Sequence, residues 1–489
     1  MENVAMENSI KRELEKIVGT DRVNDTTAAC WAYAFNDFGS VFNPPFVGGK
    51  PDIVVKPSTT EEVSKIVKLA AETETHIVPA GGREGNASGA VPTKGGIMLD
   101  LTLMDNVIKI CRKSRAVRAQ AGITYTKLRD RVKKEGYWLG NQGPGGPMGG
   151  TLGGGVSLVS TGIGGARYGQ YGENVLGLQV VLPTGEIVET GSMTNPDCDW
   201  YHRYCCGLDA SGLFIGAAGA FGVITEAAIK IHKLPAHVRS CNYGFADIEA
   251  ACRCLDEQDS YGWLYNHNVL VGSYSIAMTF PPGSPAAELI PPDTEVLVSI
   301  ALADHDELIV KRQAEIMDGV AKKHGAAVIA FPPGRPENPM MVARLAGMGL
   351  TCFCEIIYPI MQAPELCKYV LEEFIPKYED TMIRVPGMPF PYWFLCLTGV
   401  TNHAKTDFTF VYGVDVSNKE TRDAAVKTYH ELLAHIYSHY GGGAPHALAK
   451  DMYTPHWRKN LKPEYAEFLL KLKDALDPGI ICNPGSLGL

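Results

Sequence analysis

Residues 143–172, GPGGPMGGTLGGGVSLVSTGIGGARYGQYG, are the stretch that decides how this chain folds. A shorter glycine-rich stretch, AGGREGNASG at residues 80–89, directly follows a predicted strand at 76–79. We call residues 80–89 the first glycine loop and residues 143–172 the second glycine loop. Glycine lets a backbone turn through positive φ and approach a ligand closely, so that main-chain N–H groups can donate to phosphate oxygens. Two such loops, each flanked by strands, predict a nucleotide-cofactor site.

The best-known nucleotide-binding motifs are missing from the sequence. No G-x-x-x-x-G-K-[ST] stretch occurs, which argues against a P-loop. No G-x-G-x-x-G lies between an early strand and a helix with an acidic residue about twenty positions later, which argues against a Rossmann site.

The segments around the glycine loops alternate between strand and helix patterns. An apolar strand at 51–57 is followed by Ser58-Thr59-Thr60-Glu61-Glu62, a hydroxyl cap and an acidic first turn that predict a helix start. We predict further strands at 96–101 and 116–121, helices at 124–135 and 463–476, and two strands joined by a turn at 183–185.

The composition is that of a globular protein with two or three domains. The chain has 489 residues, of which 45% are hydrophobic, enough for more than one core. A net charge of −9 argues against a nucleic-acid partner, and no apolar run is long enough to span a bilayer. Residues 1–19 predict an amphipathic helix rather than a targeting signal, so we expect a cytoplasmic protein. The 13 cysteines show no C-x-x-C spacing, and we expect reduced thiols and no metal.

Several long segments, in the same order along the chain, resemble the FAD-linked oxidases of the vanillyl-alcohol oxidase / p-cresol methylhydroxylase (PCMH) superfamily. They are VPAGGREGNASGAVP (78–92), GGTLGGGVSLVSTGIGGARYG (149–169), GLFIGAAGAFGVITEA (212–227) and LDPGIICNPG (476–485). The resemblance implies an α+β fold: a PCMH-type FAD-binding domain of two α/β subdomains, and an α+β cap whose antiparallel sheet is flanked by helices. It implies an N-terminal helical segment at 1–47, the FAD-binding domain at 48–236, a substrate cap at 237–440 and a C-terminal segment at 441–489 that returns to the FAD-binding domain.

The same resemblance assigns the FAD-binding residues. Those that would hold the pyrophosphate are Gly81, Gly82, Arg83, Glu84, Gly85, Asn86 and Ser88. Those that would line the flavin are Pro144, Gly149, Gly150, Thr151, Gly153, Gly154, Ser157, Gly164 and Tyr168. Main-chain contacts to the adenine side would come from Gly222, Val223 and Ile224, and Asn483 would return to the isoalloxazine edge. Because Arg83 stands where some members place a flavin-tethering histidine, we expect noncovalent FAD.

The resemblance also points to where the chemistry would occur. Flavin enzymes of this kind move a hydride from a substrate carbon to flavin N5, and the protein supplies binding and acid–base groups. The segments expected to face the flavin contain His446, His403 and Tyr392, and Arg344 could bind a substrate carboxylate. We take these four residues as catalytic candidates.

Two substrate branches and one other class of function remain open. Residues 79–92 and 167–177 are similar to the glycolate oxidase and D-lactate dehydrogenase branch, which implies a small alcohol or 2-hydroxy acid as substrate. That branch usually carries a histidine-rich metal motif, yet the matching stretches at 399–409 and 443–447 keep one histidine each. Residues 212–230 resemble the branch that oxidises 4-hydroxybenzyl-type phenols. The third alternative is an electron-transfer subunit of a larger complex. We expect a homodimer by analogy, and the sequence does not identify the electron acceptor, whether oxygen, a quinone or a protein.

Overall fold

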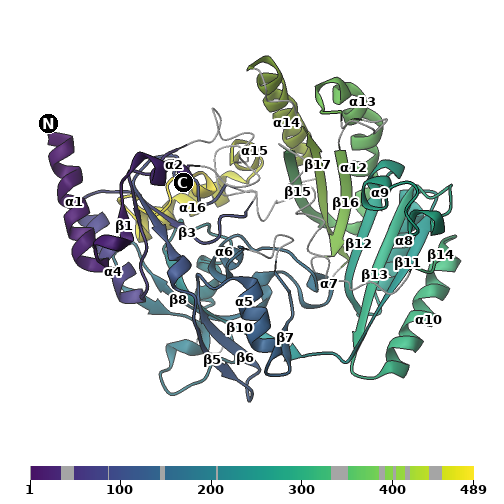
Figure 1. The fold of residues 1–489 in the computed structure, drawn as a ribbon, viewed down its shortest axis with the longest axis horizontal. Coiled ribbons are helices and arrows are strands. Elements are labelled where there is room, and N and C mark those ends of the chain that lie inside the picture. The colour runs from purple at the N-terminus through teal and green to yellow at the C-terminus, as the bar shows by residue number, and fades with distance from the viewer. Residues whose placement is uncertain are drawn as a thin grey trace.

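Three sheets organise the chain (Figure 1). The computed structural model describes residues 2–34, 49–85, 88–143, 149–204, 207–331, 351–384, 391, 393–399, 404–413, 419–439 and 454–489. The strands of the first two sheets come from residues 23–233, and those of the third from residues 237–413. This mixture of helices with parallel and antiparallel sheets confirms the predicted α+β class.

The first sheet is small and carries the first glycine loop at its edge. Its order is β1 (Val23–Asn24), β2 (Ile53–Val55), β4 (Ile97–Asp100) and β3 (Ile77–Ala80), with β2, β4 and β3 parallel. Helix α4 (Thr60–Glu72) begins where the Thr59 side chain accepts from the N–H of Glu62, as the hydroxyl-rich sequence predicts. Its apolar stripe is fully buried, and α1 (Glu2–Val18) packs against it. The short helix α2 (Thr27–Ala32) follows β1.

The second sheet is antiparallel and surrounds the second glycine loop. Its order is β5 (Val107–Cys111), β6 (Ala116–Gln120), β10 (Val223–Lys233), β8 (Val175–Val181) and β9 (Ile187–Glu189), and β7 (Tyr137–Leu139) also pairs with β10. Helix α5 (Tyr125–Lys133) and the short helices α6 (Leu152–Ser157) and α7 (Gly165–Tyr168) connect these strands. One continuous hydrophobic core joins the first two sheets.

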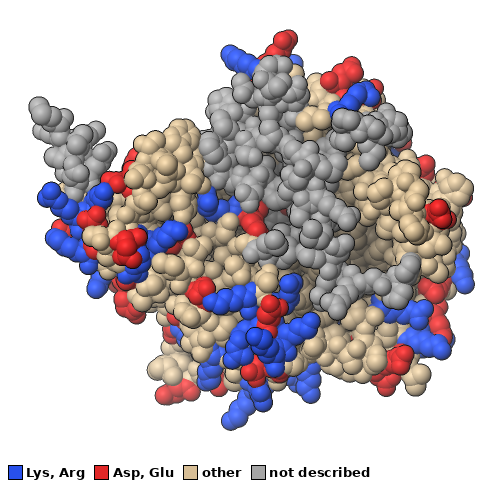
Figure 2. All heavy atoms as spheres, in the orientation of Figure 1, with Lys and Arg blue, Asp and Glu red and all other residues tan. Residues whose placement is uncertain are grey.

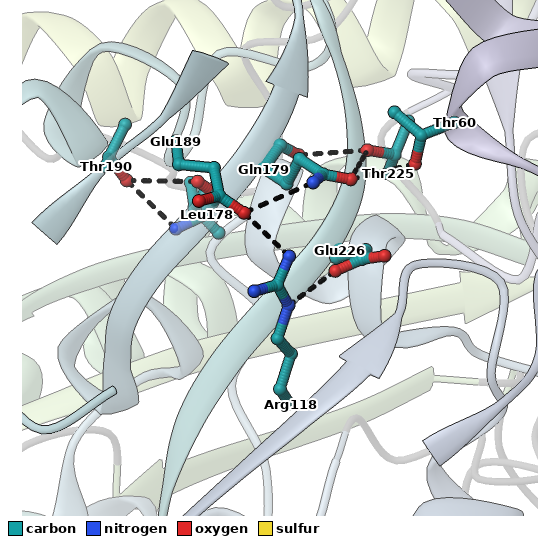
Figure 3. Close-up of polar contacts among 8 residues, drawn as sticks. All are labelled: Thr60, Arg118, Leu178, Gln179, Glu189, Thr190, Thr225 and Glu226. Carbon is teal, nitrogen blue, oxygen red and sulfur yellow. Dashed lines mark hydrogen bonds and ion pairs between the residues drawn. The ribbon is translucent and has the colours of Figure 1, made fainter. Parts of the chain in front are cut away.

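A polar network crosses the second sheet and ties four strands and α4 together (Figure 3). Arg118 on β6 donates to Glu226 on β10 at 2.5 Å and to Glu189 on β9 at 2.7 Å. The side chains of Arg118 and Glu226 are only 15% and 13% exposed. Gln179 on β8 extends the network by accepting from the Thr60 hydroxyl at the start of α4.

We expect Arg118→Met to destabilise the protein by roughly 2 kcal/mol, because it leaves the partly buried Glu226 without its cation; a fully buried pair would cost about 3–5 kcal/mol. Burial raises the pKa of Glu226, and the Arg118 charge opposes that rise. In the variant the pKa of Glu226 should be higher still, because the Arg118 charge is gone. The folded variant therefore holds the Glu226 proton more tightly than the unfolded variant does. Its deficit relative to wild type should therefore shrink as pH falls through that pKa. Urea unfolding at neutral and mildly acidic pH measures this; a deficit that grows on acidification would contradict the assignment.

The third sheet is a seven-stranded antiparallel layer flanked by helices. Its order is β14 (Ala327–Ile329), β11 (His237–Phe245), β13 (Val296–Asp304), β12 (Leu264–Val271), β16 (Trp393–Gly399), β17 (Lys405–Gly413) and β15 (Thr351–Pro359). One face packs against α8 (Ile248–Asp259), α10 (Glu307–Lys323) and α12 (Ala363–Lys368) in the largest hydrophobic cluster. Figure 1 shows these helices on the side of the sheet away from the first two sheets. The remaining helices here are α9 (Ser273–Thr279), α13 (Ile375–Tyr378) and α14 (Lys419–His439).

The C-terminal segment returns to the first sheet, beside the chain's N-terminal third (Figure 1). After α15 (Thr454–Lys459), helix α16 spans Pro463–Leu476, the bounds that the sequence predicts. Cys482 then forms a parallel bridge with Ile77 on β3. The ammonium of Lys473, 4% exposed, donates to Asp477, Ala220 and Cys482 at 2.6–2.9 Å. Asp477 in turn accepts from two main-chain N–H groups, so this buried pair fixes the tail.

The described surface mixes both signs of charge. Figure 2 shows basic side chains gathered at the lower edge of one face with acidic ones among them. Arg112 and Arg131 both pair with Glu135, an example of this mixing of charges. Among the helices that the structure describes, none is long and apolar enough to cross a membrane. The cysteines whose side chains are described are all free, and all but Cys198 are buried.

Candidate functional site

The two glycine loops press directly against each other. A Cβ atom added at Gly82 would lie 1.6 Å from the main-chain oxygen of Gly149, and one at Gly81 would lie 2.0 Å from the Thr151 hydroxyl oxygen. Distances this short essentially never occur for a real Cβ, so only glycine fits at either position without moving the opposite loop. The structure therefore brings together the loops that the sequence analysis placed on opposite sides of a cofactor.

Glu84 ties the loops together through its carboxylate. Its two oxygens accept from the N–H groups of Gly149 and Gly150 at 2.5 and 2.7 Å. Two adjacent N–H groups that point at one anion are the arrangement that glycine-rich phosphate sites use. Glu84, which the sequence analysis placed at the pyrophosphate, therefore links the two loops in this structure.

Arg83 points away from the second loop. Its guanidinium donates to the main-chain oxygen of Ala32 at 2.7 Å and lies 4.3 Å from the centre of the Tyr33 ring. Its φ of 59° and the φ of 55° at Ser88 are left-handed values that non-glycine residues seldom adopt. The first loop is therefore sharply turned, with the Arg83 side chain bound to the N-terminal segment.

The second glycine loop contains the short helix α6, whose glycines allow close packing. The Thr151 hydroxyl caps this helix by accepting from the N–H of Gly154 at 3.4 Å. A Cβ at Gly153 would lie 2.7 Å from that of Ala121, and one at Gly155 would overlap the Tyr125 hydroxyl at 1.4 Å. The glycines of this loop allow the short helix to lie directly on the core of the second sheet.

Two further predicted segments converge on the loops. The main-chain oxygen of Ser157 accepts from the N–H of Ala218 at 2.9 Å. The Asn483 amide donates to the main-chain oxygens of Gly89 and Ala218 at 2.8 and 2.5 Å. Asn483 thus joins the first loop, the turn before β10 and the C-terminal tail. In that turn Gly222 has φ 148°, while the side chains of Val223 and Ile224 are buried in the core, which leaves only main-chain atoms for a ligand.

Two predicted flavin-lining residues lie apart from this cluster. Gly164 packs its backbone against the oxygen of Gly140 and the ring of Tyr265. The Tyr168 ring lies 4.1 Å from that of His232, tilted by 36°, and meets Trp138 edge-on. Both residues sit where the second glycine loop meets the third sheet, rather than where the two loops touch.

Several predicted residues lie outside the described residues. They are the cofactor candidates Asn86 and Pro144 and all four catalytic candidates, His446, His403, Tyr392 and Arg344. A second arginine of the cap, Arg384, is described, and it is exposed at an isolated bridge with Pro391.

The described residues fit a dinucleotide held by main-chain groups. The two glycine loops, linked by Glu84 through the Gly149 and Gly150 N–H groups, and the Asn483 amide of the tail all converge within one region. The residues suited to FAD are thus present and close together.

Comparisons with known proteins agree with this geometry. Residues 51–191 match the family described as FAD binding domain. The chain is 23% identical to the glycolate oxidase subunit GlcD of Bacillus subtilis over 98% of its own length and 96% of the relative's. It is 27% identical to the mitochondrial cytochrome-type D-lactate dehydrogenase of Arabidopsis thaliana, over 89% of this chain and 73% of that one. The crystal structure of p-cresol methylhydroxylase with substrate bound superposes with a TM-score of 0.82 at 17% identity, covering 99% and 96% of the two chains.

The fold, the paired glycine loops and these matches define an FAD-dependent oxidoreductase. More particularly, the chain carries an FAD binding domain, is related in sequence to a glycolate oxidase subunit and to D-lactate dehydrogenases, and shares its fold with p-cresol methylhydroxylase.

We expect Glu84→Gln to weaken FAD binding about 10-fold. The amide keeps one acceptor oxygen and loses the other along with the charge, and a lost hydrogen bond to a charged group is worth about 1.5–3 kcal/mol. Fluorescence titration of apoprotein with FAD measures the change. The matched control is Glu186→Gln, at a residue outside both glycine loops whose exposed carboxylate accepts from the Thr184 hydroxyl, and this change should leave the affinity unchanged. Tighter FAD binding in Glu84→Gln would instead mean that the carboxylate competes with the cofactor.

The sequence analysis did not identify the buried residues that anchor the C-terminal tail and that join the third sheet to the second glycine loop. Lys473 and Asp477 form an i, i+4 pair on and just after α16, a spacing that usually marks a solvated helix face. Asp407 on β17 is buried and accepts from the Thr161 hydroxyl of the second glycine loop. The sequence offered one sign that Asp407 is unusual, because this acidic residue lies within a strand of aromatic and β-branched residues, TDFTFVYG at 406–413.

Proposed function

We propose that this FAD-dependent oxidoreductase oxidises a small 2-hydroxy acid of the glycolate or D-lactate type. The observation that carries the proposal is the alignment with a glycolate oxidase subunit, which extends over 98% of the chain and so includes the cap as well as the cofactor half. The likeness to p-cresol methylhydroxylase, at 17% identity, bears on the fold and lends no support to a phenolic substrate.

We also propose a role for the FAD-binding domain and a role for the cap. The FAD-binding domain at 48–236 would hold the cofactor, with the first glycine loop and Glu84 near its pyrophosphate and Thr151, Ser157 and Asn483 near the flavin. The cap at 237–440 would bind the substrate. Bound FAD supplies the acceptor for a hydride from the substrate carbon, and the protein must place that carbon and accept the hydroxyl proton.

A second candidate function is supported by one observation. The relative that aligns over nearly its whole length is called a subunit of glycolate oxidase. The chain would then belong to a larger assembly and pass electrons to a partner protein.

Anaerobic titration of the purified flavoprotein tests the proposal. Glycolate or D-lactate is expected to bleach the oxidised flavin absorbance, and L-lactate is the stereochemical control. Bleaching by 4-hydroxybenzyl alcohol alone would replace the proposed substrate class with phenols. A flavin that no small molecule of either class reduces, but that a partner protein does, would favour the electron-transfer subunit.

A further inference from the structure

Two carboxylates lie on the face of the third sheet opposite its helices. Side chains alternate between the two faces of a strand, and Phe408 and Phe410 of β17 point into the cluster that packs against α8, α10 and α12. Asp407 and Thr409, between them, therefore point to the other face. Glu355 on β15 pairs across the sheet with Thr409, and Ile357 pairs with Asp407, so Glu355 lies on this face too, diagonal to Asp407.

Asp407 connects this face to the second glycine loop. Its Oδ2 accepts from the Thr161 hydroxyl at 3.1 Å, and the residue is 1% exposed. The other oxygen, Oδ1, is fully buried and accepts from no N–H or hydroxyl group among the described residues. A second contact joins the same two parts nearby, because the N–H of Gly164 donates to Asn266 at the start of β12. Asp407 thus sits at the junction between the cap sheet and the loop expected to line the flavin, where its carboxyl is in hydrogen-bonding contact with that of Glu355.

The surroundings of Asp407 favour its protonated form. Burial raises its pKa well above the usual range, and the negative charge of Glu355 raises it further. The charges of Asp407 and Glu355 also act on the thiols of Cys354 and Cys396 on the neighbouring strands. Burial raises their pKa values as well, so they keep their protons and cannot serve as bases at neutral pH.

We propose that Asp407 and Glu355 share one proton at neutral pH and form the acid–base pair of the oxidation, with Thr161 positioning Asp407. This inference rests on the proposed function. As the substrate is oxidised, its C–H bond breaks and the hydrogen leaves with both electrons as a hydride to the flavin. The O–H bond loses its proton to the carboxyl pair, and a C=O bond forms. The pair then returns that proton to solvent. Two neighbouring carboxyls can do this because the first proton is held tightly while the second is exchangeable.

Infrared spectroscopy tests the shared proton without any substrate. In FAD-loaded enzyme with ¹³C-labelled aspartate carboxyls, the C=O stretch of one protonated aspartate is expected at neutral pH. Asp407→Asn should remove that band. Glu355→Gln should keep it but make it titrate at lower pH, because the neighbouring charge is gone. A wild-type spectrum without this band, or an unchanged band in Asp407→Asn, would overturn the proposal.

Stopped-flow flavin reduction tests the role of the pair, using the hydroxy acid that bleaches the wild type. Asp407→Asn should slow reduction roughly 100-fold, within the usual contribution of a general base, and change the substrate dissociation constant less than about 3-fold. The matched control is Thr398→Val, because Thr398 lies directly across from Asp407 on β16 and its change should leave the rate near wild type. Reduction by Asp407→Asn at the wild-type rate would refute the acid–base role.

The two experiments separate failure of this inference from failure of the proposed function. If no hydroxy acid reduces the wild type, the proposed substrate class is wrong, and the infrared band still decides whether the pair holds a proton. If the wild type is reduced but the band is absent, the substrate class survives and the carboxyl pair does not.

Discussion

Purified Gly82→Ala protein is expected to contain essentially no FAD. The added Cβ would lie 1.6 Å from the main-chain oxygen of Gly149, and neither atom belongs to a flexible side chain that could swing aside. The two glycine loops must therefore separate, which disrupts the hydrogen bonds from the Gly149 and Gly150 N–H groups to the Glu84 carboxylate. Because the loops are expected to hold the FAD pyrophosphate between them, losing these two hydrogen bonds to a charged carboxylate, at about 1.5–3 kcal/mol each, should lower FAD affinity roughly 100-fold or more. The ratio of flavin to protein absorbance after purification, followed by titration with added FAD, measures this loss.

The neighbouring glycine supplies a matched comparison. A Cβ at Gly85 would lie 3.0 Å from the end of the Leu158 side chain, which can move. Gly85→Ala should therefore retain much more FAD than Gly82→Ala, although both alter the same loop. Equal FAD content in the two variants would show that the close approach of the loops does not control cofactor binding.

Lys473→Met is expected to destabilise the protein by about 3–5 kcal/mol, the usual cost of leaving a buried charge without its partner. Lys473 and Asp477 have side chains 4% and 1% exposed. Without the ammonium, the Asp477 carboxylate keeps two main-chain donors but no cation, and the oxygens of Ala220 and Cys482 lose their donor. The shift of the urea unfolding midpoint at neutral pH measures the loss. FAD affinity should fall as well, because the same tail carries Asn483 between the first loop and Ala218.

Another lysine on the same helix provides the control. Lys471 pairs with Glu467 at the same i, i+4 spacing in the opposite order, but both side chains are well exposed, at 72% and 65%. An exposed pair contributes about 0–1 kcal/mol, so Lys471→Met should change stability by less than about 1 kcal/mol. If both lysine variants were equally stable, the Lys473–Asp477 pair would not anchor the tail.

Local patterns predicted the elements around the glycine loops well. The apolar stripe and hydroxyl cap placed α4, and the turn at Pro183–Gly185 placed the β8–β9 hairpin, because each depends on residues close in sequence. The direction of the Arg83 side chain was not predictable. It depends on Ala32 and Tyr33, some fifty positions earlier, which only folding brings near.

The sequence alone predicted a nucleotide cofactor, because the density of glycines in two loops indicates a backbone that must turn sharply and approach phosphate closely, and the resemblance to FAD-linked oxidases specified FAD. Tertiary structure decided how the loops are held: by a carboxylate from one loop on the N–H groups of the other, and by a tail amide between two carbonyls. It also decided that Asp407 meets Thr161 across 246 positions of chain. Such partners are set by strand pairing and burial, which act between residues far apart in the chain and leave no periodic signal in it.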